Sequence, residues 1–116
     1  MPNPLCHFEF MTNDSDKCKA FYGAVFDWTF DDQSMPGYSL INAGAEPNGG
    51  VMAKPPDAPT PALNVYFQTD DIDATLALVV EAGGKVIVGK TPIPGVGSFA
   101  MFADPEGIPV GLLHTD

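Results

Sequence analysis

The sequence predicts an α+β fold made of two similar halves, each with the element order strand–helix–strand–strand–strand. Residues 6–16 (CHFEFMTNDSD) are typical of a strand that turns directly into a helix, and residues 62–73 (ALNVYFQTDDID) repeat this pattern at an offset of 57. The proline-rich stretch 55–61 (PPDAPTP) suits neither a helix nor a strand ladder and separates the two copies. We therefore predict one domain over the whole chain, with modules 5–54 and 62–113 joined by this linker.

Length and charge exclude several classes of protein. The 116 residues suffice for one domain with a real core. The chain carries five lysines, no arginine and a formal net charge of −10, which argues against nucleic acid as a partner. No apolar run approaches the roughly 20 residues of a membrane span, and the start lacks the basic-then-apolar pattern of a signal peptide. We expect a cytoplasmic, acidic protein in which Cys6 and Cys18 stay reduced.

The first half divides into five elements. Asp14 or Asn13 is expected to cap a helix, since the apolar residues that follow recur at i, i+3, i+4 and i+7. Trp28 and Phe30 share one face of a short strand, where they would serve as core, as dimer interface or as a stack for a planar ligand. The predicted strands of this half are 5–11, 27–31, 38–42 and 50–54.

The second half follows the same order. The pattern predicts a helix over 71–82 that Gly83 and Gly84 terminate. Residues 91–97 read as a loop stiffened by prolines, and Asp104-Pro-Glu-Gly107 as a type I turn. The predicted strands are 63–69, 85–88, 98–103 and 109–113.

Strand alternation selects the candidate site. His7, Glu9 and Met11 share one face of the first strand, and the internal repeat places Asn64, Tyr66 and Gln68 at the corresponding positions of the second half. One imidazole, one carboxylate, two amides and aromatic area suit a pocket for a small molecule. Residues of a core and a wet strand end would give the same pattern. The predicted ligand-binding set is His7, Glu9, Met11, Asn64, Tyr66, Gln68, Met101 and Gly111.

Several motifs in a fixed order resemble the vicinal oxygen chelate superfamily, which includes glyoxalase I, ring-cleaving dioxygenases and bleomycin-resistance proteins. They are the strand-to-helix opening, FYGAVFDW at 21–28, TDDID at 69–73, EAGG at 81–84 and FADPEG at 102–107. The resemblance covers nearly the whole chain. It implies paired βαβββ modules in a cupped mixed sheet with helices on the outer face, and a homodimer.

The resemblance also implies where a metal would bind. Metal-dependent members hold a divalent cation with four inward side chains, two from each half. The first-strand ligand matches His7, but its partner position holds Asn64 and the last-strand position holds Gly111. We therefore expect no cofactor and no metal; a divalent ion, if present, would bind His7 and Glu9.

Three functions remain open. The first is metal-independent binding of a small organic molecule by a glyoxalase/bleomycin-resistance-like protein. The second is a lyase or isomerase in which His7 or Glu9, the predicted catalytic residues, moves a proton. The third is a metal-dependent glyoxalase or dioxygenase.

Overall fold

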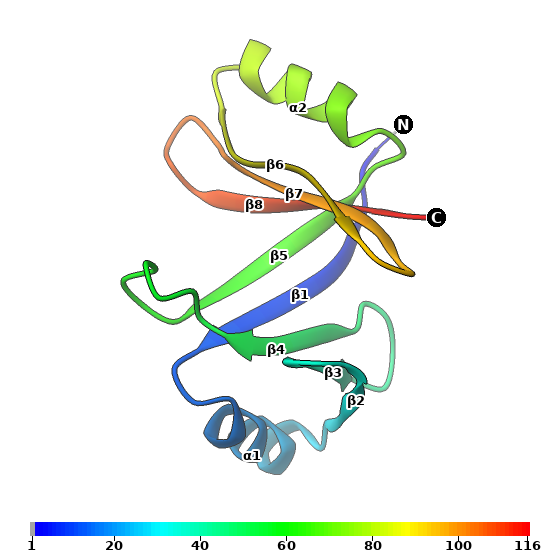
Figure 1. The fold of residues 1–116 in the computed structure, drawn as a ribbon, viewed down its shortest axis with the longest axis vertical. Coiled ribbons are helices and arrows are strands. Elements are labelled where there is room, and N and C mark those ends of the chain that lie inside the picture. Colours follow the sequence, from blue (N-terminus) through cyan, green and yellow to red (C-terminus); the bar gives the residue numbers. More distant parts are fainter. Residues whose placement is uncertain (1) are drawn as a thin grey trace. The chain divides into compact units, whose positions relative to one another are not determined.

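The computed structural model describes residues 2–116, which form ten regular elements (Figure 1). The elements are β1 (Leu5–Thr12), α1 (Ser15–Phe26), β2 (Thr29–Met35), β3 (Tyr38–Asn42), β4 (Gly49–Ala53), β5 (Ala62–Gln68), α2 (Ile72–Glu81), β6 (Lys85–Ile93), β7 (Gly97–Ala103) and β8 (Pro109–Thr115). This order is βαβββ twice, as the sequence predicts.

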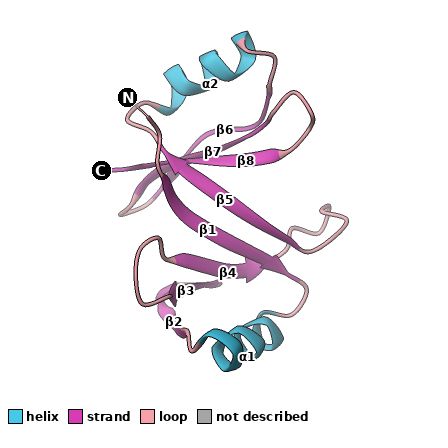
Figure 2. Ribbon diagram, turned by 180° about the vertical axis from the view of Figure 1, so that it is seen from behind, coloured by secondary structure: helices cyan, strands magenta, loops and turns pink. Residues whose placement is uncertain are grey.

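The strands form one mixed sheet in the order β2-β3-β4-β1-β5-β8-β7-β6 (Figure 2). The pairs β1–β4 and β5–β8 are parallel, whereas β2–β3, β3–β4, β6–β7 and β7–β8 are antiparallel. An α+β fold with an eight-stranded mixed sheet and two helices is therefore confirmed. The chain divides into two compact units: an N-terminal unit, His7–Asn64, and a C-terminal unit, Val65–Asp116 together with residues 2–6.

In the N-terminal unit an aromatic layer joins α1 to β1. Asp14 caps the helix, accepting a hydrogen bond from the backbone N–H of Lys17 at 3.1 Å. Because Phe8 and Phe10 alternate with His7 and Glu9, both rings point to the helix side of β1. The ring of Phe10 lies 4.7 Å from that of Tyr22, and Phe8 lies 5.6 Å from Trp28. Trp28 thus belongs to the aromatic packing between helix and sheet.

In the C-terminal unit α2 packs on β6, β7 and β8 (Figure 1). Asp71 caps this helix, accepting from the backbone N–H of Ala74 at 3.0 Å. Gly83, at φ 102°, follows its end in a conformation that suits glycine. The buried core of this unit consists of Ile72, Leu76, Ala100 and Leu112, with Phe102 packed against it.

Two strand predictions were wrong in extent. The strand predicted at 27–31 runs from Thr29 to Met35. Its pairing with β3 is interrupted by a register shift after Asp31 and resumes at Met35, which extends the strand. The strand predicted at 85–88 continues through Thr91 and Pro92 to Ile93, so residues 91–93 of the predicted loop 91–97 are extended. Since β6 is one of the two edge strands, Pro92 is tolerated there, and two register shifts absorb the irregular pairing with β7.

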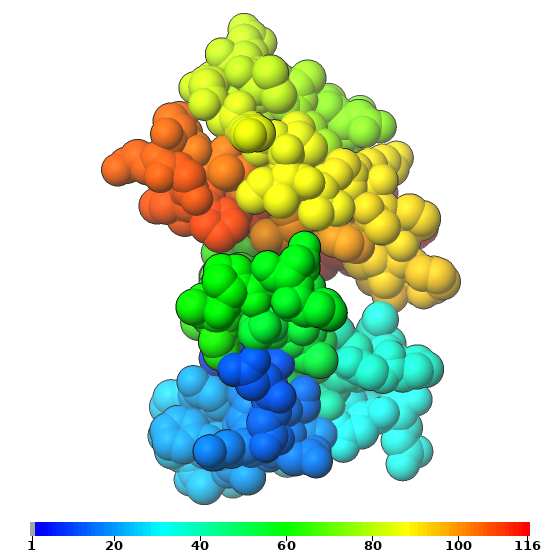
Figure 3. Space-filling model, turned by 60° about the vertical axis from the view of Figure 1, so that its left-hand side comes forward, coloured from blue at the N-terminus to red at the C-terminus, as the bar shows by residue number. Residues whose placement is uncertain are grey.

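Two further features concern the surface. The linker region (green) and the turn after β2 (cyan) both lie at the surface (Figure 3). Neither of the helices found in residues 2–116 is long and apolar enough to cross a membrane.

Candidate functional site

A chain of hydrogen bonds joins three side chains of the N-terminal unit. The hydroxyl of Tyr38 donates to Oε2 of Glu9 at 2.8 Å, and Nε2 of His7 lies 2.8 Å from the same hydroxyl. Glu9 is buried, with 6% of its surface exposed, whereas His7 and Tyr38 are half-buried. His7 and Glu9 are thus connected through Tyr38.

Strand register and one glycine explain this arrangement. Glu9 pairs with Gly50 on β4, and Gly50 pairs with Leu40 on β3, so Tyr38, two residues before Leu40, stands on the same face as Glu9. A Cβ atom at Gly50 would lie 2.1 Å from the far end of the Tyr38 ring. The missing side chain therefore leaves room for the tyrosine to lie across β4 and reach β1.

The hydrogen bonds favour one tautomer of His7. A tyrosine hydroxyl has a single hydrogen; when Tyr38 donates it to Glu9, Nε2 of His7 is the donor in the contact between His7 and Tyr38. Burial lowers the pKa of His7 from its ordinary value of 6.5, which favours the neutral ring at pH 7. A neutral imidazole protonated on Nε2 carries its basic lone pair on Nδ1.

The lowered pKa of His7 predicts that stability falls on acidification. Between about pH 7 and pH 5 the unfolded chain takes up a proton at its ordinary pKa, whereas the folded His7 resists protonation. With respect to His7, the free energy of unfolding is therefore constant above the pKa of the unfolded chain. It decreases as the pH falls from that value toward the lower pKa of the folded protein. Urea unfolding of the wild type and of His7→Gln across this range measures the effect.

The variant His114→Gln is the matched control, since the chain has two histidines and His114 lies on β8.

The pKa values of Asp31 and Asp32 are lowered by hydrogen bonds, chiefly from Ser34 and Ser39 respectively. Both carboxyls therefore lose their stabilising effect below their ordinary value of 3.8, outside the window of His7. If the free energy of unfolding of His7→Gln falls with pH as steeply as that of the wild type, the loss of stability does not come from His7.

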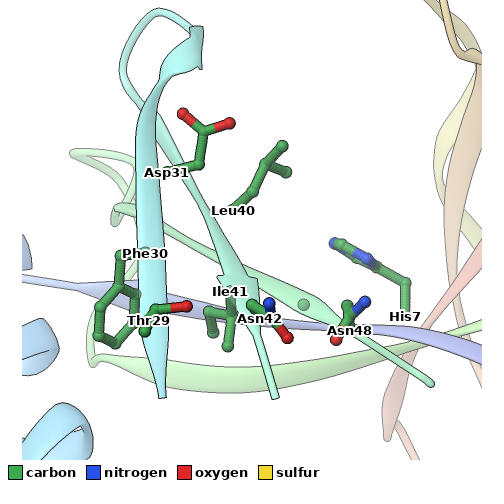
Figure 4. A pocket seen from close by; sticks show the side chains of 9 residues that line it. His7, Thr29, Phe30, Asp31, Leu40, Ile41, Asn42 and Asn48 are labelled. Atoms are coloured by element: carbon green, nitrogen blue, oxygen red, sulfur yellow. The ribbon is translucent and has the colours of Figure 1, made fainter. Parts of the chain in front are cut away.

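A cavity of about 440 Å³ opens beside His7 within the N-terminal unit (Figure 4). Asp31, Leu40 and His7 stand around it in Figure 4, while the ring of Phe30 lies on the other side of β2. The lining residues are His7, Thr29, Phe30, Asp31, Leu40, Ile41, Asn42, Asn48 and Gly49. This volume suits a small organic molecule.

In the C-terminal unit four predicted site residues lie on or beside one row of the sheet. Tyr66, Gly111 and Met101 pair in register across β5, β8 and β7. Tyr66 is buried, Met101 is half-buried, and a Cβ at Gly111 would lie 2.3 Å from the Tyr66 ring. Gln68 is exposed at the end of β5, where its backbone carbonyl accepts from Asn3 and its N–H donates to the carbonyl of Pro4.

The residues at the predicted metal positions do not suit a divalent cation. Nε2 of His7 is held by Tyr38, and the amide nitrogen of Asn64 donates to the sulfur of Met11 at 3.4 Å. Gly111 lies under the Tyr66 ring, as Gly50 lies under Tyr38. Within residues 2–116 no three histidine, cysteine, aspartate or glutamate side chains cluster in a way that could hold a metal ion.

Sequence reasoning missed Tyr38 and most of the cavity lining. The prediction compared the first strands of the two halves, but the cavity is lined chiefly by β2, β3 and the loop before β4. One signal was present: the alternation of the strand predicted at 38–42 sets Tyr38, Leu40 and Asn42 on one face. The pairing of that strand, which assigns this face to His7, could not be read from the alternation.

Comparison with known proteins identifies the family. The family model of the Glyoxalase/Bleomycin resistance protein/Dioxygenase superfamily matches residues 5–112, and the chain belongs to this superfamily. The protein is glyoxalase-like in this sense, as the resemblance predicts.

Among curated proteins, the chain is 34% identical over 111 residues to CFP32 of Mycobacterium tuberculosis, a protein named as a glyoxylase. That match covers 90% of this chain and 42% of CFP32. The anthracycline biosynthesis protein DnrV of Streptomyces peucetius is 31% identical, over 91% of this chain and 45% of DnrV. The chain thus spans less than half the length of these two relatives.

Among solved structures, methylmalonyl-CoA epimerase from Mycobacterium tuberculosis superposes with a TM-score of 0.74. The match covers 97% of this chain and 87% of the epimerase, at 14% identity. At this identity the likeness shows the fold alone.

Proposed function

We propose that this protein binds a small organic molecule, without a metal ion, in the cavity beside His7. The observation that carries the proposal is the position of His7, which lines a cavity of about 440 Å³ and is held by a hydrogen bond to Tyr38. The cavity combines an apolar wall at Leu40 with polar groups at Thr29 and Asn42, a mixture that suits ligand binding.

A fragment screen followed by backbone-amide NMR tests this proposal. Ligands are expected to shift the amides of Asn42 and Gly49, which border the cavity. His7→Gln is expected to weaken binding by about 1–3 kcal/mol if the imidazole contacts the ligand. His114→Gln, which alters a histidine that does not line the cavity, is expected to leave the affinity unchanged. Fragments that shift only amides elsewhere would refute the proposal.

A second candidate function is proton transfer to or from the bound molecule. The hydrogen-bonded chain of His7, Tyr38 and Glu9 favours it, because the buried carboxyl connects to the cavity through two further proton-carrying groups. In this proposal His7 takes a proton from the ligand, the Nε2 proton of His7 moves to Tyr38, and the hydroxyl proton of Tyr38 moves to Glu9. This is the chemistry of an isomerase or lyase.

The same variants separate binding from catalysis. For an enzyme, His7→Gln and Glu9→Gln are both expected to lower kcat on an identified substrate by about 10²–10⁴-fold. For a binding protein, Glu9→Gln is expected to change affinity less than His7→Gln, because Glu9 does not line the cavity. Equal, small effects of both variants on kcat would refute proton transfer by this chain.

Elemental analysis of protein purified without chelators tests the metal-free proposal, which stoichiometric, tightly bound metal would overturn. The homodimer and the cytoplasmic location stay predictions. Light scattering of the purified protein tests the first of them.

A further inference from the structure

The charge of the cavity restricts its ligand. Thr29, Asp31, Asn42 and Asn48 line it together with His7, and no lysine is among the lining residues. The chain has no arginine, and burial favours the neutral form of His7. Asp31 is therefore the one side chain of the lining with a full charge at pH 7.

Local hydrogen bonds keep this charge in place. Oδ1 of Asp31 accepts from the backbone N–H groups of Gln33 at 2.9 Å and Ser34 at 3.2 Å, and Oδ2 accepts from the Ser34 hydroxyl. The hydrogen bond from the Ser34 hydroxyl lowers the pKa of the Asp31 carboxyl most, and the two backbone hydrogen bonds lower it further. An ionised carboxylate offers about four acceptor positions, so one remains for a ligand donor.

The two amides supply the opposite kind of contact. Oδ1 of Asn42 accepts from the backbone N–H of Gly44 at 2.9 Å, and Oδ1 of Asn48 accepts from that of Ala43 at 3.0 Å. With both oxygens held by the loop, the amino ends are the donors that can meet an oxygen atom of a ligand.

We propose that the cavity selects an amine-bearing organic cation, with its ammonium group toward Asp31 and a hydroxyl or carbonyl oxygen toward Asn42 and Asn48, and discriminates against anions. The inference rests on the proposed function, since it specifies the ligand of the same cavity. A carboxylate or phosphate ligand would meet the charge of Asp31 with no cation in the lining to offset it. The wall formed by Leu40 would contact the apolar part of the ligand.

Three probes of similar shape and different charge test the selectivity: 2-naphthylmethylamine, 2-naphthylmethanol and 2-naphthoate. Titration at low ionic strength, followed at the amides of Asn42 and Gly49, is expected to give at least about tenfold tighter binding of the amine than of the carboxylate. The ratio should shrink as salt is added, because screening weakens interactions between partly exposed charges.

Asp31→Asn and Asp32→Asn separate local contact from net charge. Both variants remove one negative charge, but Asp32 faces Lys19 on α1, 3.0 Å away, and does not line the cavity. Asp31→Asn is expected to abolish most of the preference for the amine, whereas Asp32→Asn should keep it. Thermal melts of both variants check that they fold.

The outcomes distinguish this inference from the proposed function. If all three probes bind equally, or if the two variants behave alike, the selectivity proposed here is overturned while ligand binding in the cavity stands. If none of the probes shifts the cavity amides at millimolar concentration but neutral or anionic fragments from the screen do, the inference is again overturned. If nothing shifts these amides, the proposed function fails as well.

Discussion

Replacing Gly111 by alanine is expected to destabilise the protein by about 3 kcal/mol, the upper end of the usual cost of overpacking. A Cβ at this position would lie 2.3 Å from Cδ2 and 2.8 Å from Cγ of Tyr66. Cγ sits next to the backbone of β5, and Tyr66 is only 5% exposed, so the ring has little freedom to move aside. Chemical unfolding in urea measures the loss.

A double-mutant cycle with Tyr66→Ala provides the control for this prediction. If steric conflict is the cause, the double variant will be less destabilised than the sum of the two single variants. Gly50→Ala should cost less than Gly111→Ala, because the added methyl would meet the far end of the Tyr38 ring rather than its base. Additive effects in the cycle would show that the two residues do not conflict.

Replacing Tyr38 by phenylalanine is expected to cost about 2–4 kcal/mol, the sum of two lost contacts to buried or half-buried groups. The ring and its packing on Gly50 remain, but Glu9 loses a donor at 2.8 Å and Nε2 of His7 loses its acceptor. The route proposed for a proton between His7 and Glu9 would be interrupted at this position. NMR titration of the His7 ring measures the change directly, since its tautomer and pKa both depend on the partner of Nε2.

Tyr22→Phe is the matched control for Tyr38→Phe. Tyr22 belongs to the aromatic layer between α1 and β1, with its ring 4.7 Å from Phe10, and does not line the cavity. It should leave the titration of His7 unchanged. If Tyr38→Phe also leaves the His7 ring unchanged in tautomer and pKa, the hydrogen-bonded chain does not exist in solution.

The fold was predictable because its signals are local and occur twice. Asp14 and Asp71 cap the two helices as expected, and the predicted strand precedes each cap. The less accurate predictions concern strands whose pairing is irregular. In β2 and β6 register shifts extend the strand beyond the point where a regular pattern ends, and prolines in an edge strand look like a loop.

The candidate site was predictable only in part. Alternation placed His7 and Glu9 on one face, but their link depends on a tyrosine 29 residues after Glu9 and on the absence of a side chain at Gly50. Such a contact depends on strand order and register, which one sequence does not supply. Asp31 and Asn48 line the cavity because of the positions that β2 and the loop before β4 take in the folded chain, and these positions also depend on strand order and register.

The two tyrosine–glycine pairs have a consequence for how this chain could change during evolution. A glutamate introduced at position 50 or 111 would collide with Tyr38 or Tyr66 before it could reach any ion. At position 111 a carboxylate ligand would therefore need a second substitution, at Tyr66, whereas at position 50 the far end of the Tyr38 ring would have to move aside. Each intermediate would pass through a less stable protein, and removal of Tyr38 would also break the hydrogen bonds to His7 and Glu9. If the site works without a metal, as proposed, this mutational barrier would separate the chain from metal-dependent relatives.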